Sequence, residues 1–450
     1  MATIPARPVG ADVDRDGLRA VGAWFLCWIL LPNAGYWALW IVGGPPRAWP
    51  VLAAGFAGIV AHRAPFWVRF TLFLLLMIHS ALSFIAALFN LSISSLAHSL
   101  RFAAELSPSA SIEYVVAGAV VVATAFAAWK LLRRPAVLAR PILIIAAAAI
   151  TIVAASVDVA MADGNRGSYH RTPDAGAPFD SAAKDSGLER IATGQRHVLM
   201  IMVEAMGQPV DPRLRTRLAE IWARPEVRAR YEVTTGETLF YGSTTNGEMR
   251  ELCGRWGEYD EVMDRRDGNC LPARLAARGY RSQAWHSFVG SFFDRTTWYP
   301  NIGFEQMRWG PDLVQDGAEV CPGVFPGACD RDVPRQIGRA LRAAESPQFL
   351  YWLTVNSHLP VVSDAQLGTD DCARFDAGLA RDHPMICRLF ELYDQTGAAL
   401  AREITAEDFP ATDILIVGDH LPPFFDRHHR SQFAPDSVPW VLLRPKNNGL

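Results

Sequence analysis

The first third of this chain carries its apolar residues in long stretches without charge, and this feature restricts its fold more than any other. A helix needs roughly 20 predominantly apolar residues to cross a bilayer. We expect five membrane-spanning helices, of which the second is short: residues 18–42, 49–62, 66–89, 114–132 and 142–161. Residues 1–162 are therefore predicted to form a transmembrane anchor, and the later residues a separate domain.

Positive charges beside these segments predict their orientation, because lysine and arginine favour the cytoplasmic side of a membrane. One set of loops carries most of them and the opposite set carries few: Arg7, Arg15, Arg19, Arg63, Arg69, Lys130, Arg133, Arg134 and Arg140 against Arg47 and Arg101. The N-terminus is then cytoplasmic, and an odd number of spans places the rest of the chain outside. Residues 163–195, rich in Gly, Asp, Ser and Pro, are predicted to be an exposed linker. Residues 196–450 are predicted to form a periplasmic or otherwise extracytoplasmic domain of an inner-membrane protein.

Six of the seven cysteines lie in the second half of the chain, and an even number there is consistent with disulfides in an oxidising compartment. Their short separations favour local pairing, Cys253–Cys270, Cys321–Cys329 and Cys372–Cys387. The alternative is that some of them are buried thiols.

Four short apolar runs in the second half end at residues that bind metals or phosphate. The runs 197–203, 281–285, 349–355 and 413–418 end at Glu204, His286, Asn356-Ser357-His358 and Asp419-His420. Such runs, alternating with helical patterns at 212–230, 332–344 and 384–404, predict an α/β fold with a mostly parallel sheet. Ligands of such sheets bind beyond the carboxyl ends of the strands. We therefore expect one crevice to contain Glu204, His286, His358, Asp419 and His420, although a lone histidine such as His286 is equally well a core residue.

Two threonines, Thr244 and Thr245, lie at the predicted start of a helix. A helix N-terminus favours negative charge. A threonine hydroxyl becomes a useful nucleophile only when a metal or a base activates it. The alternative is that Thr244 is only an N-cap.

The motifs of this half occur together in a known order. They are VEAM at 203–206, GSTTNGE at 242–248, SFFDR at 291–295, WYPNIGF at 298–304, VNSHLP at 355–360 and GDH at 418–420. From about residue 198 onward the chain resembles the lipoteichoic acid synthase group of the alkaline phosphatase/sulfatase superfamily. This group includes phosphoglycerol transferases of periplasmic glucans and is related to lipid A phosphoethanolamine transferases. The five-span anchor also resembles that of the group.

The resemblance implies a role for each matching residue. One divalent ion (Mn²⁺, Mg²⁺ or Zn²⁺) would be bound by Glu204, Thr244, Asp419 and His420, and Thr244 would also be the nucleophile. The substrate phosphate would lie against the following residues: Arg295 with Phe293 beside it, His358, and either His428 or His429. His358 would be catalytic if it protonates the departing diacylglycerol; the alternative is that it only holds the phosphate. The alternative for Arg295 is that it only forms an ion pair with a carboxylate.

The chain also departs from the family pattern. Leu421-Pro422-Pro423 replaces the usual glycine after Asp-His, and the element at 321–331 is closer to the phosphoethanolamine transferases. The formylglycine signature Cys-x-Pro-x-Arg of true sulfatases is absent.

These features predict a membrane-bound transferase that moves a phospho-alcohol, phosphoglycerol in preference to phosphoethanolamine, from a phospholipid to an envelope glycan or lipid. A phosphodiesterase or phosphatase and a non-catalytic envelope scaffold are the alternatives. The net charge of −3, without any basic run, argues against a nucleic-acid partner.

Overall fold

The computed structural model describes residues 15–40, 46–88, 112–162, 178–424 and 427–446. Arg7 and Arg101, used above for orientation, lie outside these residues, and so does the first part of the predicted linker. The chain divides into two compact units, and each is described by itself.

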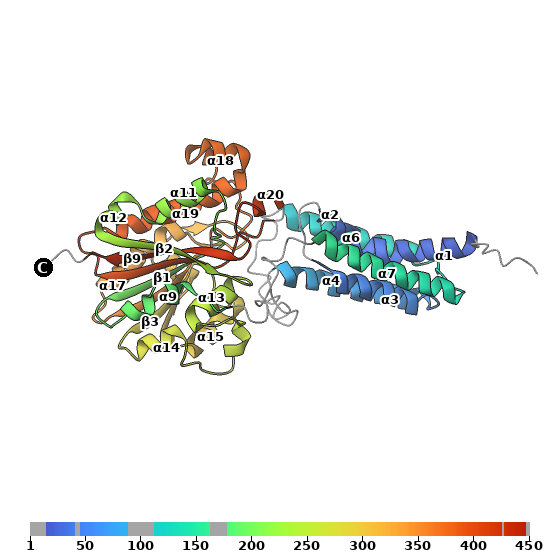
Figure 1. Ribbon diagram of the computed structural model, residues 1–450, viewed down its shortest axis with the longest axis horizontal. Coiled ribbons are helices and arrows are strands. Elements are labelled where there is room, and N and C mark those ends of the chain that lie inside the picture. The colour runs from blue at the N-terminus through green and yellow to red at the C-terminus, as the bar shows by residue number, and fades with distance from the viewer. Residues whose placement is uncertain (1–14, 41–45, 89–111, 163–177, 425–426, 447–450) are drawn as a thin grey trace, which may run out of the picture. The chain divides into compact units, whose positions relative to one another are not determined.

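The N-terminal unit is helical. Its elements are α1 (Arg15–Phe25), the π-helical η1 (Leu26–Leu30), α2 (Leu31–Ala38), α3 (Ala48–Val60), α4 (Phe66–Leu88), α6 (Ile112–Leu131) and α7 (Pro141–Ala162) (Figure 1). Each of the five predicted segments contains a helix. By length and composition, three helices can cross a membrane: Arg15–Ala38, Phe66–Ala86 and Pro141–Ala162. The apolar helices Ala48–Val60 and Val115–Leu131 are shorter, so three of the five predicted segments have the length and composition of a spanning helix.

The second unit has a seven-stranded sheet and a separate two-stranded hairpin. The strands are β1 (His197–Val203), β2 (Tyr231–Leu239), β3 (Arg281–His286), β4 (Gln306–Arg308), β5 (Val320–Cys321), β6 (Gly327–Ala328), β7 (Gln348–Leu353), β8 (Thr412–Gly418) and β9 (Ser437–Pro445). The large sheet has the order β2-β9-β8-β1-β7-β3-β4, and β5 pairs with β6.

Five neighbouring strands of the large sheet, from β8 through β4, run parallel, whereas β9 is antiparallel to both of its neighbours. The register pairs Val203 of β1 with Gly418 of β8, and Met202 with Leu353 of β7. The three central strands therefore end together. The sheet is mostly parallel, as predicted, and it places the residues that follow these strands at one edge.

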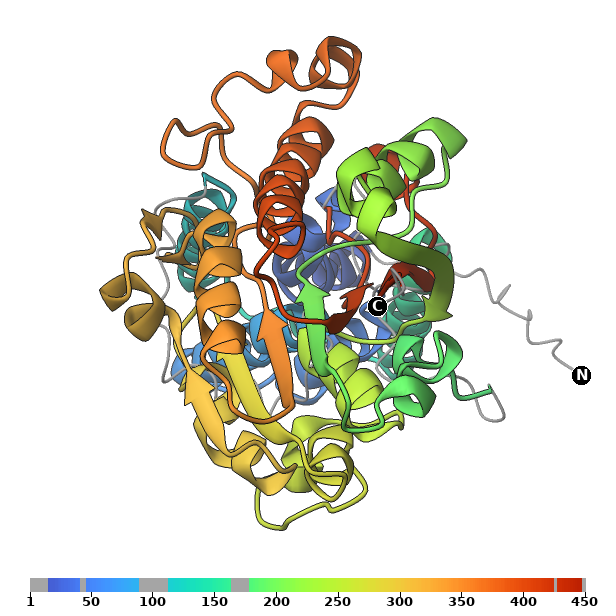
Figure 2. The same cartoon turned by 90° about the vertical axis from the view of Figure 1, so that its left-hand side faces the viewer.

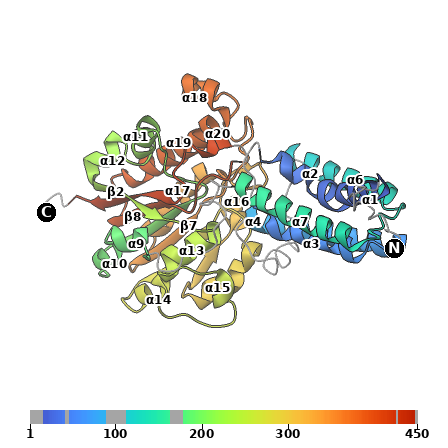
Figure 3. The same cartoon turned by 45° about the vertical axis from the view of Figure 1, so that its right-hand side comes forward.

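Helices cover both faces of the twisted sheet (Figures 1 and 2). They are α9 (Ala182–Asp185), α10 (Leu188–Ile191), α11 (Pro212–Trp222), α12 (Pro225–Arg230), α13 (Thr244–Cys253), η4 (Tyr259–Val262), α14 (Leu271–Ala276), η5 (Phe292–Asp294), α15 (Arg295–Asn301), α16 (Gly310–Gln315), η6 (Asp330–Asp332), α17 (Val333–Arg342), η7 (Cys372–Arg374), α18 (Ala377–Asp382), α19 (Pro384–Ile404) and α20 (Arg427–Arg430). Helices α11, α12 and α19 lie on one face, and α9, α13, α14 and α15 lie on the other (Figures 1 and 3). Each face buries its own apolar cluster, since alternate strand residues point to opposite sides.

Two segments differ from the prediction. The helix expected over 212–230 is divided into α11 and α12, because the residue before Pro225 is disfavoured in a helix. The described end of the predicted exposed linker is folded into the domain: Ala182 and Ala183 are fully buried, and Leu188 is 1% exposed. This short segment has too few apolar residues to show a helical period in sequence.

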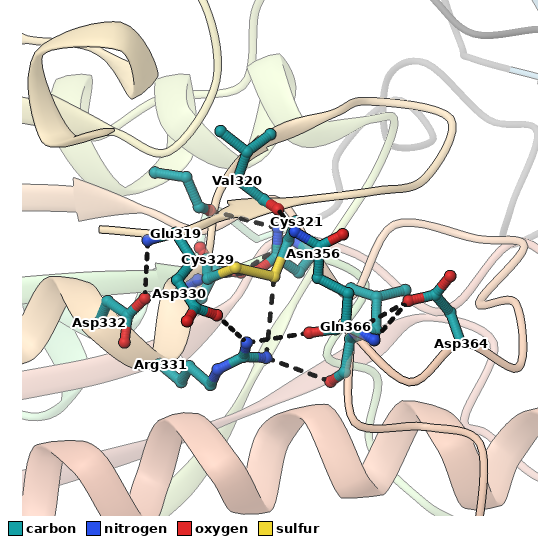
Figure 4. Close-up of a disulfide and its surroundings, with 12 residues drawn as sticks. Glu319, Val320, Cys321, Cys329, Asp330, Arg331, Asp332, Asn356, Asp364 and Gln366 are labelled. Atoms are coloured by element: carbon teal, nitrogen blue, oxygen red, sulfur yellow. Dashed lines mark hydrogen bonds and ion pairs between the residues drawn. A yellow bond between two sulfur atoms is a disulfide. The ribbon is translucent and has the colours of Figure 1, made fainter. Parts of the chain in front are cut away.

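The three predicted disulfides are confirmed, Cys253–Cys270, Cys321–Cys329 and Cys372–Cys387. Cys321–Cys329 closes the β5–β6 hairpin immediately before Asp330 (Figure 4).

Candidate functional site

Four predicted residues meet beyond the carboxyl ends of β1 and β8. The Thr244 hydroxyl lies 3.1 Å from Glu204 Oε2 and 3.3 Å from His420 Nε2. His420 Nε2 also lies 3.5 Å from Glu204 Oε1 and 3.3 Å from Asp419 Oδ2. One carboxylate comes from β1 and the Asp-His pair from β8, while the threonine opens α13. Sheet topology thus brings together residues that are far apart in sequence.

This group has the donor set of a divalent-cation site. Glu204 Oε1 and Asp419 Oδ2 are buried and accept no hydrogen bond. Burial, and then the neighbouring Asp419 carboxylate, raise the pKa of Glu204 well above its usual value. Two buried carboxylate oxygens that lie close together without a donor are unfavourable unless a cation or a proton lies between them. The residues therefore fit a bound metal ion, and ligand atoms of Glu204, Asp419 and His420 all lie within 4.8 Å of one another.

Neighbouring hydrogen bonds orient these ligands. His420 Nδ1 lies 2.8 Å from the Leu421 carbonyl, which only accepts, so Nδ1 holds the proton and the lone pair of Nε2 faces the cluster. Asp419 Oδ1 accepts the backbone N–H groups of Ala205 (2.8 Å) and His420 (2.7 Å). Only Oδ2 of Asp419 is left for a cation.

The turn after β1 is strained in a way that aims Glu204 at the cluster. Ala205 has a φ of 55°, which a residue with a side chain rarely adopts. Tyr393 donates to the Ala205 carbonyl at 2.5 Å, and Ser357 donates to the Glu204 carbonyl at 2.6 Å. The Glu204 N–H is bound by the Thr354 hydroxyl at 2.9 Å. Tyr393 and Thr354 were not predicted, because each acts on a turn distant in sequence; Ser357 was expected beside the crevice, but its contact with the Glu204 carbonyl was not.

Helix α13 distinguishes the two candidate threonines. Its N-cap is Ser243, so the alternative that Thr244 is the N-cap is wrong. Asn246 Oδ1 accepts the Ser243 N–H at 2.9 Å and thereby closes the first turn. Thr245 is 1% exposed, and its hydroxyl lies 3.2 Å from that of Ser243. Only Thr244 is both partly exposed and in contact with Glu204.

Arg295 does not have the predicted phosphate-binding arrangement. Its guanidinium is 1% exposed and donates to Glu248 Oε2 from Nη2 at 2.8 Å and from Nε at 3.1 Å. The Tyr299 and Tyr351 hydroxyls donate to the same carboxylate. Burial alone would lower the pKa of Arg295, but the Glu248 carboxylate outweighs burial and raises it. The carboxylate-pairing alternative is correct, and Phe293 lies beside this buried pair with its ring 5.5 Å from the guanidinium carbon.

The two strand-end histidines are outside the four-residue group. His286 is buried with Nδ1 3.1 Å from the Leu353 carbonyl, and burial holds its pKa well below the usual value. His286 is therefore a core histidine with a satisfied hydrogen bond, which is the alternative given for it above. His358 is partly exposed, with its ring 4.2 Å from that of Phe325 and Nδ1 2.8 Å from the Leu359 carbonyl. Burial is the main cause that lowers the pKa of His358 to about 3, with a smaller contribution from the neighbouring His420, so His358 is neutral at pH 7.

The loop that carries His358 is held by Asp330, which the sequence analysis did not select. The Asp330 carboxylate accepts the N–H groups of Val355 (3.1 Å) and Asn356 (2.7 Å), and Asn356 Oδ1 accepts the Asp330 N–H at 2.7 Å (Figure 4). The adjacent disulfide is a detectable sequence signal for this position, because it anchors the residue before Asp330.

His428 and His429 form a ring cluster with His383, which the sequence analysis also missed. The centroid of the His383 ring lies 4.8 Å from that of His428 and 5.3 Å from that of His429. Within the described part of the chain, none of these three belongs to the cation-site group. The choice between His428 and His429 as a phosphate contact stays a prediction.

The geometry defines a class of protein, an α/β domain with a threonine hydroxyl and an acidic candidate cation site at the carboxyl ends of its parallel strands. The model of the family called Sulfatase matches residues 197–447, more than half of the chain. The chain therefore belongs to the sulfatase family.

Individual relatives are distant. A protein of Rhizobium meliloti (strain 1021), named for cyclic beta-1,2-glucan modification, is 25% identical over 245 residues, which are 51% of this chain and 36% of that protein. The chain thus spans about a third of that relative's length. Among solved structures, the lipoteichoic acid synthase LtaP from Listeria monocytogenes is 15% identical with a TM-score of 0.44, over 57% of this chain and 67% of that one. The phosphoglycerol transferase GacH of Streptococcus pyogenes, in complex with sn-glycerol-1-phosphate, is 17% identical with a TM-score of 0.38, over 57% and 72%.

Proposed function

We propose that this protein is a membrane-anchored transferase that moves a phospho-alcohol head group, phosphoglycerol in preference, from a phospholipid to an envelope glycan or lipid. The observation that carries the proposal is the position of the Thr244 hydroxyl, 3.1 Å from Glu204 and 3.3 Å from His420, beside two carboxylate oxygens that accept no hydrogen bond. A hydroxyl in such a place is suited to attack phosphorus. A scaffold without activity would not need this arrangement.

The proposed reaction has two displacements at phosphorus. Thr244 Oγ1 forms a bond to phosphorus while the bond from phosphorus to the diacylglycerol oxygen breaks; Glu204 Oε2 accepts the hydroxyl proton, and the departing diacylglycerol oxygen takes up one proton from water. An acceptor hydroxyl then attacks the phosphothreonine, the bond from phosphorus to Thr244 Oγ1 breaks, Thr244 takes back the proton held by Glu204, and the proton of the acceptor hydroxyl returns to water as the phosphodiester product leaves. A divalent ion (Mn²⁺, Mg²⁺ or Zn²⁺) on Glu204, Asp419 and His420 would supply a lowered hydroxyl pKa and neutralise charge on the phosphoryl oxygens.

The roles of the nearby histidines and arginine follow from their protonation and contacts. His358 is neutral at pH 7, and its one ring proton lies on Nδ1, which donates to the Leu359 carbonyl, so it has none to give to the leaving diacylglycerol. Arg295 supports the site through Glu248 and not through the phosphate. Stabilisation of charge, usually the largest catalytic contribution, is therefore assigned to the cation site.

The location and the partners are parts of the same proposal. Three helices long and apolar enough to cross a membrane support an anchor beside an insoluble lipid donor, and we retain the five-span topology with a cytoplasmic N-terminus. The three disulfides support an oxidising, extracytoplasmic location for residues 196–450. The name of the Rhizobium relative supports a glycan as the acceptor. Transfer of phosphoethanolamine is the second candidate, favoured by the Cys321–Cys329 element.

Lipid and glycan analysis of a strain lacking the gene, restored with wild-type protein or with single variants, tests the proposal. Wild type should consume one phospholipid and release diacylglycerol, and the mass of the modified product distinguishes phosphoglycerol from phosphoethanolamine. Thr244→Ala should lower turnover by about 10³-fold or more, since a nucleophile has no substitute. Thr245→Ala is the matched control, because its hydroxyl contacts Ser243 and not the carboxylates. Full activity of Thr244→Ala, or free head group released without any acceptor, would overturn the assignment.

A further inference from the structure

Two charged residues of α13 connect the candidate cation site to the segment that follows the anchor. Arg250 and Glu251 are each 1% exposed and form an ion pair with Nε 2.6 Å from Oε1. Neither residue belongs to the proposed reaction. Removing both charges from water costs free energy, which further hydrogen bonds of the two side chains must offset. These hydrogen bonds indicate the role of the pair.

Arg250 binds the main chain of the residue that carries the cation ligand. Its Nη1 donates to the Asp419 carbonyl at 3.1 Å, and its Nη2 donates to the Gly418 carbonyl at 2.7 Å. Helix α13 approaches this turn closely, since a Cβ on Gly247 would lie 3.1 Å from the Asp419 Cα. The planar guanidinium therefore fixes Asp419 relative to the helix that begins at Thr244.

Glu251 connects this arrangement to α9. Its Oε1 accepts the Ala182 N–H at 3.1 Å, and its Oε2 accepts the Ala183 N–H at 2.8 Å. These two N–H groups belong to the first turn of α9, where a helix has no internal acceptors for them. The same carboxylate thus binds α9 and the guanidinium that holds Asp419.

We propose that Arg250 is a positioning residue for the cation site, and that Glu251 makes this positioning depend on the docked segment 181–185. The inference rests on the proposed function only in assuming that the site binds a cation. The consequence is that loosening α9 weakens metal binding, although α9 contributes no ligand. Partners that orient metal ligands typically change metal affinity about 10–100-fold.

Two substitutions interrupt the connection at different points. Glu251→Gln keeps the shape of the side chain but removes its charge, so that Arg250 is left without its ionic partner. Ala182→Pro removes one N–H donor and places the ring where Glu251 Oε1 lies. Ala182 is the first residue of α9 and follows Ser181 in an extended conformation (φ −155°, ψ 145°), which is the backbone that proline accepts.

Ala377→Pro is the matched control. Ala377 is also the first residue of a short helix, α18, after an extended N-cap (Asp376, φ −155°, ψ 105°), but it is exposed and lies in a different part of the chain. Its substitution should leave metal binding unchanged.

The experiment titrates Mn²⁺ into detergent-solubilised full-length protein by calorimetry and follows backbone hydrogen exchange of the metal-free protein by mass spectrometry. Glu251→Gln and Ala182→Pro should raise the Mn²⁺ dissociation constant about 10-fold or more and speed exchange at both 181–185 and 418–420. Ala377→Pro should do neither.

Each outcome bears on one of the two proposals. If exchange rises at 181–185 alone, or if both variants bind Mn²⁺ within about twofold of wild type, the connection is refuted. If wild type binds no divalent ion, the proposed function fails, and the exchange at 418–420 still decides whether the connection exists. A variant that unfolds at the assay temperature is identified by its melting curve and is then measured at a lower temperature.

Discussion

The buried Asp330 carboxyl predicts a specific pH dependence of stability. Burial raises its pKa from 3.8 to about 6, although hydrogen bonds from Ser287 and from the N–H groups of Asn356 and Val355 oppose the increase. In the unfolded chain the group returns to its ordinary pKa, so the folded protein binds this proton more tightly. The contribution to stability is therefore unfavourable above about pH 6 and disappears as the pH falls below 3.8.

The size of the effect follows from the shift. At 1.36 kcal/mol per pKa unit, the shift from 3.8 to about 6 changes the free energy of unfolding by ~3 kcal/mol in total. A change of about 2 kcal/mol falls between pH 7 and pH 4. Asp330 is 4% exposed, so solvent screening reduces this value little. In a domain of about 250 residues, 2 kcal/mol corresponds to about 4–8 °C in melting temperature.

The assay compares wild type with Asp330→Asn, which has a similar shape but does not titrate. Tryptophan fluorescence melts of both proteins at pH 4, 5, 6 and 7 remove the contributions of the other carboxyl groups by subtraction. Wild type should gain about 4–8 °C relative to the variant as the pH falls from 7 to 4. A difference between the two proteins that stays constant over this range would show that Asp330 does not have a raised pKa.

Three further outcomes concern the site. Arg295→Met should lower the unfolding free energy by about 3–5 kcal/mol, because it leaves the Glu248 carboxylate buried and unpaired; an effect as small as that of Arg281→Met, whose ion pair is exposed, would contradict this. Mn²⁺ at about 100 times its dissociation constant should add about 2.7 kcal/mol to wild type, measured as a rise in melting temperature, and Glu204→Gln should remove that rise; equal rises in both proteins would exclude Glu204 as a ligand. His358→Gln should keep transferase activity within about 10-fold of wild type, because the histidine is already neutral at pH 7, whereas loss of a general acid would cost about 10²–10⁴-fold.

Much of the cation site was determined by the sequence itself. Glu204 and the Asp419-His420 pair each follow a short apolar run, and parallel strands place the residues after such runs at one edge of the sheet. The local separations of the cysteines likewise indicated the pairing that the structure has. These inferences depend on the positions of short apolar runs and on short separations between cysteines, and both can be read from a single sequence.

Other features were decided only by tertiary contacts. Arg295 binds Glu248, 47 residues away, and the sequence alone left phosphate and carboxylate as alternatives. The choice of Thr244 over Thr245 depends on which hydroxyl faces Glu204, because both occupy the same first turn of α13. A period or a motif identifies which residue types are available, but not which of two neighbouring groups points toward a distant partner.

The segment before β1 shows the same division most clearly. Its composition predicted an exposed linker, yet Ala182 and Ala183 within it are fully buried, and their N–H groups bind Glu251, 69 residues beyond Ala182. Composition records the average polarity of a segment, whereas docking depends on a few N–H groups that meet one carboxylate. The sequence therefore determined where the strands end and which types of ligand follow them. The packing of α9, α13 and the turn after β8 determined how these ligands are held. Burial and hydrogen bonding depend on residues that come together from distant parts of the chain, so only the tertiary structure could decide them.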